Sequence, residues 1–257
     1  MLIYQQVCLH QTWQANLFRA SHRLVRHCNP QAELMVIDSG SSIDPRTCLT
    51  GDWQICELPH EDDIPVGPLG NWVFRFRDSI GHPYRGGAKV GAHINGAGRG
   101  VVKGIAIAQA NGIEHLGFID YDVLCVKPLP LVDTFACLAP SRILNLALQW
   151  DIFSINAGWA VKVNFIDRYD WAAHRDWNLH NDERHVAMIV GDDLRFLPLK
   201  GDRFEFNVSP QQLRALYPDG GCDWITHAQE PTLQEFLRMH GHADIATVFD
   251  PLSEEAR

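Results

Sequence analysis

Short apolar runs separated by polar turns dominate the first half of the chain and predict alternating strands and helices. The runs at residues 2–9, 34–37 and 53–58 have the length and composition of strands. Residues 13–25, between the first two runs, carry apolar side chains at helical spacing and predict a helix. A strand, a helix and a second strand in this order are typical of a parallel α/β sheet.

The rest of the chain is more irregular. Residues 59–99 are rich in Gly and Pro and interrupt the alternation, so we expect a long functional connection there. Residues 101–110 predict a helix of small residues, which precedes a further apolar strand ending at Ile119. Later helices are predicted at residues 164–177, 182–190 and 232–239, with a strand at residues 194–199.

Two carboxylates directly follow the apolar strand that ends at Ile119. Asp120 and Asp122 are two positions apart, and residues at this spacing in a strand share one face. Two such carboxylates are costly beside an apolar strand unless a cation lies between them. Mg²⁺ and Mn²⁺ take oxygen ligands of this kind and often share them with substrate phosphates. The segment is therefore a candidate metal site, and the alternative is a polar exit from the strand.

A second apolar strand also ends in an acid. Asp38 follows the run at residues 34–37 and precedes the small residues Ser39 and Ser41. Ligands of parallel sheets bind beyond the carboxyl ends of the strands. We therefore expect the Asp38 strand to neighbour the Asp120 strand and to open onto the same crevice.

These two motifs, in this order, resemble the nucleotide-sugar signatures of GT-A glycosyltransferases. In that family an early strand ends in an Asp-x-Gly-Ser-x-x-Asp-like sequence that holds the nucleoside, here Asp38 to Asp44, and a later strand ends in a metal-binding Asp-x-Asp. Residues 155–161 are similar to the family's Asn-x-Gly strand turn, so Asn156 and Gly158 would line the donor-sugar pocket. The resemblance implies an α/β, GT-A-like, Rossmann-type fold with a doubly wound, mostly parallel central sheet and flanking helices.

The resemblance also implies one GT-A-like domain over residues 1–257. Residues 1–127 would form the nucleotide-sugar-binding half, and residues 128–257 an irregular acceptor-binding half. The implied activity is hexosyltransferase-type transfer of a sugar from a nucleotide-diphosphate sugar, in the first instance a UDP-sugar. The partner substrate would be a saccharide or another hydroxyl acceptor.

The implied cofactor is Mn²⁺ or Mg²⁺. Asp120, Asp122 and the late histidine His227 would hold the ion, and an imidazole ligand favours Mn²⁺ over Mg²⁺. The alternative for His227, one of 13 histidines, is a structural or solvated side chain.

The same resemblance gives roles at the donor nucleotide. Asp38, with Ser39 and Ser41 nearby, would accept hydrogen bonds from the base or ribose, and Asp120 would contact the metal, the ribose or both. Lys103, in the small-residue helix, would reach a donor phosphate. Its alternative is a solvated helix lysine.

Asp182 and Glu183 are the candidate catalytic acids. They precede an apolar run at residues 186–190, so one interpretation is a helix start whose acids complement the helix dipole. In the functional interpretation, one of them deprotonates the acceptor hydroxyl in an inverting transfer. In a retaining transfer it would stabilise or attack the oxocarbenium-like centre. The sequence leaves both outcomes open.

Composition excludes some functions. A net charge of −9 without clustered Lys and Arg argues against a nucleic-acid partner. We expect no membrane-spanning helix, because no apolar run reaches about 18 residues, and the first residues lack signal-peptide features. The seven cysteines form no Cys-x-x-Cys pair, which fits a reducing, cytoplasmic setting and leaves peripheral membrane association open.

Two alternative functions remain at this point. Residues 118–123 also resemble the nucleophile strand of haloacid-dehalogenase-like phosphatases, with Asp120 and Asp122 as its acids and Asp192 and Asp193 as a second acidic motif. That nucleophile strand normally opens its domain, whereas here more than a hundred residues precede it. The second alternative is a non-catalytic GT-A-like protein that binds a carbohydrate or nucleotide.

Overall fold

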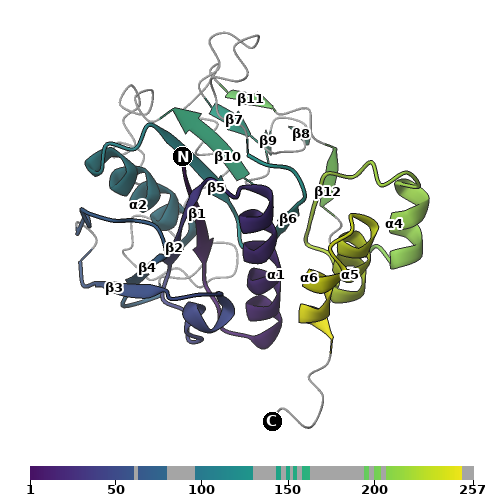
Figure 1. Ribbon diagram of the computed structural model, residues 1–257, viewed down its shortest axis with the longest axis horizontal. Coiled ribbons are helices and arrows are strands. Elements are labelled where there is room, and N and C mark those ends of the chain that lie inside the picture. Colours follow the sequence, from purple (N-terminus) through teal and green to yellow (C-terminus); the bar gives the residue numbers. More distant parts are fainter. Residues whose placement is uncertain are drawn as a thin grey trace.

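The computed structural model describes residues 1–60, 63–79, 96–129, 143–145, 149–150, 153–154, 158–162, 194–196, 200–203 and 207–250. Within these ranges the main sheet has the strand order β11-β7-β10-β5-β1-β2-β4-β3 (Figure 1). Its strands are β1 (Leu2–Val7), β2 (Glu33–Asp38), β3 (Gln54–Leu58), β4 (Trp72–Phe76), β5 (His115–Ile119), β7 (Ile143–Asn145), β10 (Gly158–Lys162) and β11 (Leu194–Phe196).

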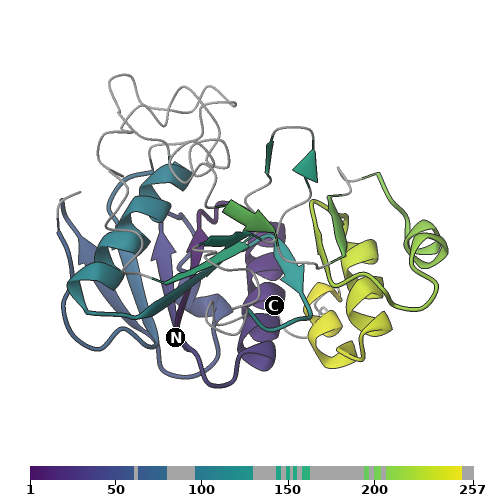
Figure 2. The same ribbon diagram turned by 90° about the horizontal axis from the view of Figure 1, so that it is seen from above.

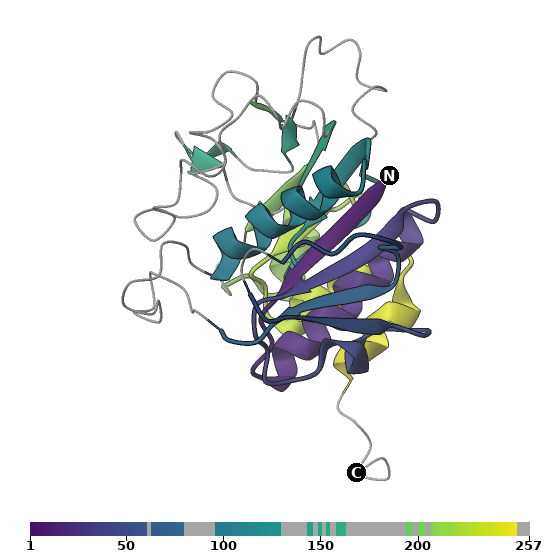
Figure 3. The same ribbon diagram turned by 90° about the vertical axis from the view of Figure 1, so that its left-hand side faces the viewer.

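Five neighbouring strands of this sheet, β5, β1, β2, β4 and β3, run parallel. Strand β10 is antiparallel to β5, and β7 is antiparallel to β10. Helices α1 (Thr12–Cys28) and α2 (Gly96–Ala110) cover opposite faces of the parallel strands (Figure 3). The predicted α/β fold with a mostly parallel central sheet and flanking helices is confirmed.

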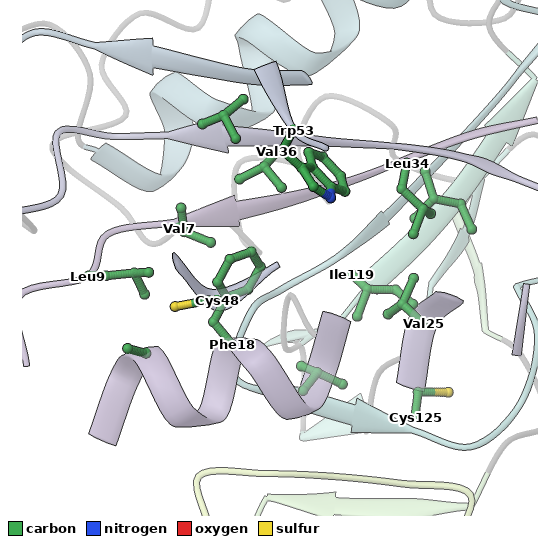
Figure 4. Close-up of a cluster of buried hydrophobic side chains, with 14 of the residues drawn as sticks. Val7, Leu9, Phe18, Val25, Leu34, Val36, Cys48, Trp53, Ile119 and Cys125 are labelled. Carbon is green, nitrogen blue, oxygen red and sulfur yellow. The ribbon is translucent and has the colours of Figure 1, made fainter. Parts of the chain in front are cut away.

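Side chains alternate between the two faces of the sheet, as the strand period requires. On the α2 side, Leu2 and Tyr4 of β1 pack in one buried cluster with Val101 and Ile105 of α2. On the α1 side, buried residues of β1, β2 and β5 surround Phe18 and Val25 of the helix; those labelled in Figure 4 include Val7, Leu34, Val36 and Ile119. The sheet therefore has an apolar core on each face.

Helix α2 lies close to β1 because of two glycines. A Cβ at Gly104 would stand only 2.6 Å from the ring of Tyr4, and one at Gly100 would overlap the side chain of Gln6. Small residues at these positions let the helix backbone approach the strand.

A second, smaller unit packs against α1 (Figure 2). It consists of the three-stranded sheet β12-β13-β6 and C-terminal helices whose apolar side chains form a third buried cluster with Leu17, Ala20 and Leu24 of α1. The elements are β6 (Val123–Cys125), β12 (Gly201–Arg203), β13 (Trp224–Thr226), α4 (Pro210–Leu216), α5 (Glu230–Met239), α6 (Ala243–Ala246) and the 3₁₀ turn η6 (Thr247–Phe249). Also described are the 3₁₀ turn η1 (Pro45–Cys48) and the hairpin strands β8 (Gln149–Trp150) and β9 (Phe153–Ser154).

The structure corrects two expectations about the strands. The Asp38 strand, β2, does not neighbour the Asp120 strand, β5, because β1 pairs with both and lies between them. Strand β4 was not predicted and falls within residues 59–99, which were expected to be a connection. The predicted helices at residues 164–177 and 182–190 lie outside the described residues.

Two expectations from composition concern membranes and cysteines. Among the helices in the described part of the chain, none combines the length and apolar character needed to cross a membrane. No disulfide bond joins the cysteines of the same part.

A buried polar network ties α1 to the sheet. Gln5 Nε2 donates to Ser21 Oγ at 2.9 Å, and Ser21 Oγ donates to the carbonyl of Val123 at 2.8 Å. Because the amide NH₂ of Gln5 is used in this way, its Oε1 accepts from His22 Nδ1 at 2.9 Å. Burial, aided by the neighbouring charge of Arg26, lowers the pKa of His22 from 6.5 to about 3. His22 is therefore neutral in the folded protein.

We expect this neutral histidine to make stability fall on acidification. The unfolded chain takes up a proton at His22 as the pH drops through 6.5, whereas the folded chain does so only near pH 3. The free energy of unfolding is thus unaffected by His22 above pH 6.5. Between pH 6.5 and pH 3 it falls by about 1.4 kcal/mol per pH unit. Urea unfolding at pH 7 and pH 5 measures the loss. His22→Asn keeps a donor without titrating, and an equally steep loss in that variant would contradict the assignment.

Candidate active site

The carboxyl ends of the parallel strands carry the polar residues that the sequence singled out. Asp38 is the last residue of β2, and Asp120 follows the last residue of β5. Both strands run parallel to β1, so these positions lie at the same edge of the sheet. This edge is where ligands bind in open α/β sheets.

Asp38 is fully buried and organises the turn that follows β2. Its Oδ1 accepts from the backbone N of Ser41 at 2.8 Å and from Ser41 Oγ at 2.5 Å. Ser41 Oγ in turn accepts from the backbone N of Leu9 at 2.7 Å, which ties this turn to the loop after β1. Ser39, also buried, donates its backbone N–H to the carbonyl of Val7. Direct contact of Asp38, Ser39 or Ser41 with a nucleoside stays a prediction.

The Asp120–Asp122 segment differs from the expected strand. Strand β5 ends at Ile119, and Asp120 Oδ1 accepts from the backbone N of Tyr121 at 2.7 Å. The backbone N of Val123 then donates to the carbonyl of Asp120, which closes a turn. The expectation that Asp120 and Asp122 share a strand face is wrong, because the chain leaves the extended conformation between them.

Asp122 instead pairs with the late histidine. Strands β6 and β13 are antiparallel, with Val123 opposite Thr226, so Asp122 and His227 flank the same end of the pair. Asp122 Oδ2 lies 3.0 Å from His227 Nε2, and Thr226 Oγ1 donates to the carbonyl of Asp122 at 3.0 Å. His227 adopts a left-handed φ of 53°, which is uncommon for a residue with a side chain.

The donor atoms of this pair fit a divalent first-row cation. A carboxylate oxygen and an imidazole nitrogen suit Mn²⁺, and both side chains stay partly exposed, at 22% for Asp122 and 27% for His227. In the described part of the chain, no three His, Cys, Asp or Glu side chains gather as a metal-binding group. Two of the three predicted ligands are therefore adjacent, and remaining coordination positions would fall to water or substrate oxygens.

Tyr121 contributes to the same edge, although no sequence motif pointed to it. Its hydroxyl accepts from Gln14 Nε2 at 3.4 Å, near the start of α1. Burial and the charges of Asp122 and Asp120 raise its pKa above the ordinary value of a tyrosine. Tyr121 therefore remains a neutral phenol that connects the acidic turn to α1.

The other predicted residues fall into two groups. Gly158 begins β10 and pairs with Ile119, directly before Asp120, so it lies at the site edge. Lys103 is buried instead of solvated: its Nζ donates to the carbonyl of Asp63 at 2.8 Å and lies 5.5 Å from the ring centroid of Phe76. A phosphate contact of Lys103 stays a prediction. The remaining predicted residues, Asn156, Asp182 and Glu183, lie outside the described part of the chain.

Comparison with known proteins gives matches in structure. No protein-family model matches the chain, and the comparison with curated proteins gives no match. An active-site mutant of LgtC has a TM-score of 0.52 and 13% identity, over 99% of this chain and 98% of that one. The galactosyltransferase LgtC in complex with donor and acceptor sugar analogs has a TM-score of 0.52 and 12% identity, over the same shares.

The bifunctional glycosyltransferase WbbM also matches, with a TM-score of 0.52 and 13% identity over 96% of this chain and 51% of that one. At these identities the likeness establishes a shared fold. The described part of the chain thus shares the fold of these glycosyltransferases.

Proposed function

We propose that this protein is a metal-dependent glycosyltransferase that uses a nucleotide-diphosphate sugar, in the first instance a UDP-sugar, as donor. The observation that carries the proposal is the 3.0 Å approach of Asp122 Oδ2 to His227 Nε2 at the ligand-binding edge of a sheet shared with glycosyltransferases. A saccharide or another hydroxyl compound is the proposed acceptor, since LgtC binds donor and acceptor sugar analogs on this fold.

In this proposal Asp122 and His227 would hold a divalent cation, with Mn²⁺ preferred to Mg²⁺, close to the diphosphate of the donor. Asp120, two positions before Asp122, would add negative charge and contact the ion or the ribose. When bound, the cation offsets the negative charge that develops on the nucleoside diphosphate leaving group.

The residues of the chain position the donor around this ion. The turn after Asp38 receives the nucleoside, and the buried carboxylate acts by holding Ser41 in place. Gly158, beside the end of β5, would line the donor-sugar pocket together with Asn156. Asp182 or Glu183 acts at the sugar C1, as the base of an inverting transfer or as a stabilising carboxylate in a retaining one.

The proposal is tested by sugar-nucleotide turnover with purified protein. With UDP-glucose and UDP-galactose as donors, we expect release of UDP in the presence of Mn²⁺. EDTA should abolish the release, and added Mn²⁺ should restore it. UDP binding without any turnover would instead identify a non-catalytic binding protein. Release of phosphate from a small phosphomonoester with Mg²⁺, without UDP release, would identify the phosphatase alternative.

A further inference from the structure

An acid and a base face each other across two neighbouring strands of the main sheet. The parallel pairing of β2 and β4 places Arg75 opposite Asp38. Both side chains lie on the same face of the sheet as buried Val36 and Val73, which is the face covered by α1. Asp38 has no exposed surface, whereas the Arg75 side chain is 26% exposed. The pair therefore lies at the boundary between the core and the ligand-binding edge.

The guanidinium of Arg75 holds two groups of the turn that follows β2. Arg75 Nε lies 3.2 Å from Asp38 Oδ2, and Arg75 Nη2 donates to the carbonyl of Ser41 at 2.6 Å. Asp38 Oδ1 binds the backbone N and the hydroxyl of the same Ser41. Arg75, Asp38 and Ser41 thus form a closed set of contacts, which we call the β2–β4 clamp.

A second contact from the segment after β4 supports the same turn. Gly40 has a φ of +87°, and a Cβ at this position would lie 2.6 Å from the backbone carbonyl carbon of Asp78 and would overlap the backbone of Ser79. The backbone at residues 78–79 therefore lies directly against Gly40 of the turn, in addition to the contacts from Arg75.

Burial of the Asp38 carboxylate in this clamp has a high free-energy cost if its only role is to form a turn. A fully buried carboxylate loses its hydration, and burial raises the pKa of Asp38 although the bonds from Ser41 and the charge of Arg75 act in the opposite direction. The carboxylate of Asp38 has no exposed surface in this structure, and its Oδ1 binds the turn that it supports. The location of the clamp at the ligand-binding edge indicates a role in binding.

We propose that Arg75 is a positioning residue for the donor nucleotide. By pairing with Asp38 and holding the Ser41 carbonyl, it keeps the turn at residues 39–42 in the shape that receives the nucleoside. This inference rests on the proposed function, and it assigns to that site a residue that the sequence motifs do not contain.

The test compares UDP binding, in the presence of Mn²⁺, by the full-length protein and its variants. Arg75→Gln removes the charge and should raise the dissociation constant for UDP about tenfold. In turnover assays with a UDP-sugar it should raise KM by a similar factor and change kcat less than twofold. Arg75→Lys keeps a charge near Asp38 but loses the planar, two-point contact, so it should recover part of the loss. A merely structural role would give no such split between KM and kcat.

Arg214→Gln is the matched control. Arg214 on α4 also pairs with a carboxylate, that of Glu235 on α5, with Nε and Oε1 2.5 Å apart, but in the C-terminal unit and not at the edge of the main sheet. We expect its UDP affinity to equal that of the wild type. Asp38→Asn completes a double-mutant cycle with Arg75→Gln: the two losses should not add, because both break the same clamp.

The possible results separate this inference from the proposed function. If the wild type binds no UDP with Mn²⁺, the proposed function fails and the inference falls with it. If the wild type binds UDP and Arg75→Gln binds within twofold of it, the inference alone is overturned. Should Arg75→Gln fail to fold, Arg75→Lys decides: a wild-type UDP affinity in that variant overturns the inference, and a weakened one supports it.

Discussion

Replacing Asp122 with Asn is expected to lower metal-dependent turnover of a UDP-sugar by at least about 100-fold, the usual cost of removing one major electrostatic group from an active site. The amide keeps the shape of the side chain but carries no charge and binds Mn²⁺ weakly. The fold should be retained, because the side chain is partly exposed and the backbone carbonyl that accepts from Thr226 is unchanged. Steady-state rates at saturating Mn²⁺ and circular dichroism check both parts.

The partner histidine gives the internal comparison. His227→Gln should lose activity as well, and the double variant should be no worse than Asp122→Asn alone, because the two side chains act as one unit. Asp244→Asn changes an exposed acid on α6, outside the site, and should leave the rate unchanged. Full activity in Asp122→Asn would rule out the Asp122–His227 pair as the metal site.

The second large effect concerns the strand that presents His227. Trp224→Ala should destabilise the protein by about 3–5 kcal/mol, which corresponds to a fall in Tm of roughly 10 °C. Trp224 is only 1% exposed on β13, and its indole occupies the space that a side chain at Gly201 would fill. Truncation leaves a cavity two residues before Thr226. Thermal unfolding of the wild type and the variant measures the loss.

Leu216→Ala is the control for this prediction. Leu216 is also a large apolar residue of the C-terminal unit but is exposed at the end of α4, so its truncation should shift Tm by no more than about 2 °C. If Trp224→Ala shifted Tm as little as Leu216→Ala, Trp224 would have no part in anchoring the β13 strand.

The elements with strong local patterns could be predicted from the sequence. The apolar runs of β1 and β2 and the helical spacing in α1 led directly to a parallel α/β sheet. Strand β4 was missed because Arg75 interrupts its apolar run inside a segment rich in Gly and Pro. Helix α4 was missed as well, although Ser209 caps it and Pro210 starts it, because few of its residues are apolar.

The sequence indicated which residues form the candidate site but only part of their spatial arrangement. Asp38 and Asp120 were correctly assigned to strand ends. The pairing of β6 with β13 joins residues about a hundred positions apart, and no local pattern encodes such a contact. This strand pairing brings Asp122 next to His227. Arg75 was not predicted as a site residue for a similar reason, since its position opposite Asp38 depends on the register between β2 and β4.

The location of the metal ion tests the central claim most directly. Crystals of the full-length protein grown with Mn²⁺ and UDP should show an anomalous manganese signal in contact with Asp122 Oδ2 and His227 Nε2, with UDP phosphate oxygens completing the coordination. Crystals of Asp122→Asn prepared in the same way should lack the signal at this position. A wild-type structure with UDP bound at the carboxyl edge and no manganese at this pair, or with manganese held elsewhere, would contradict the account.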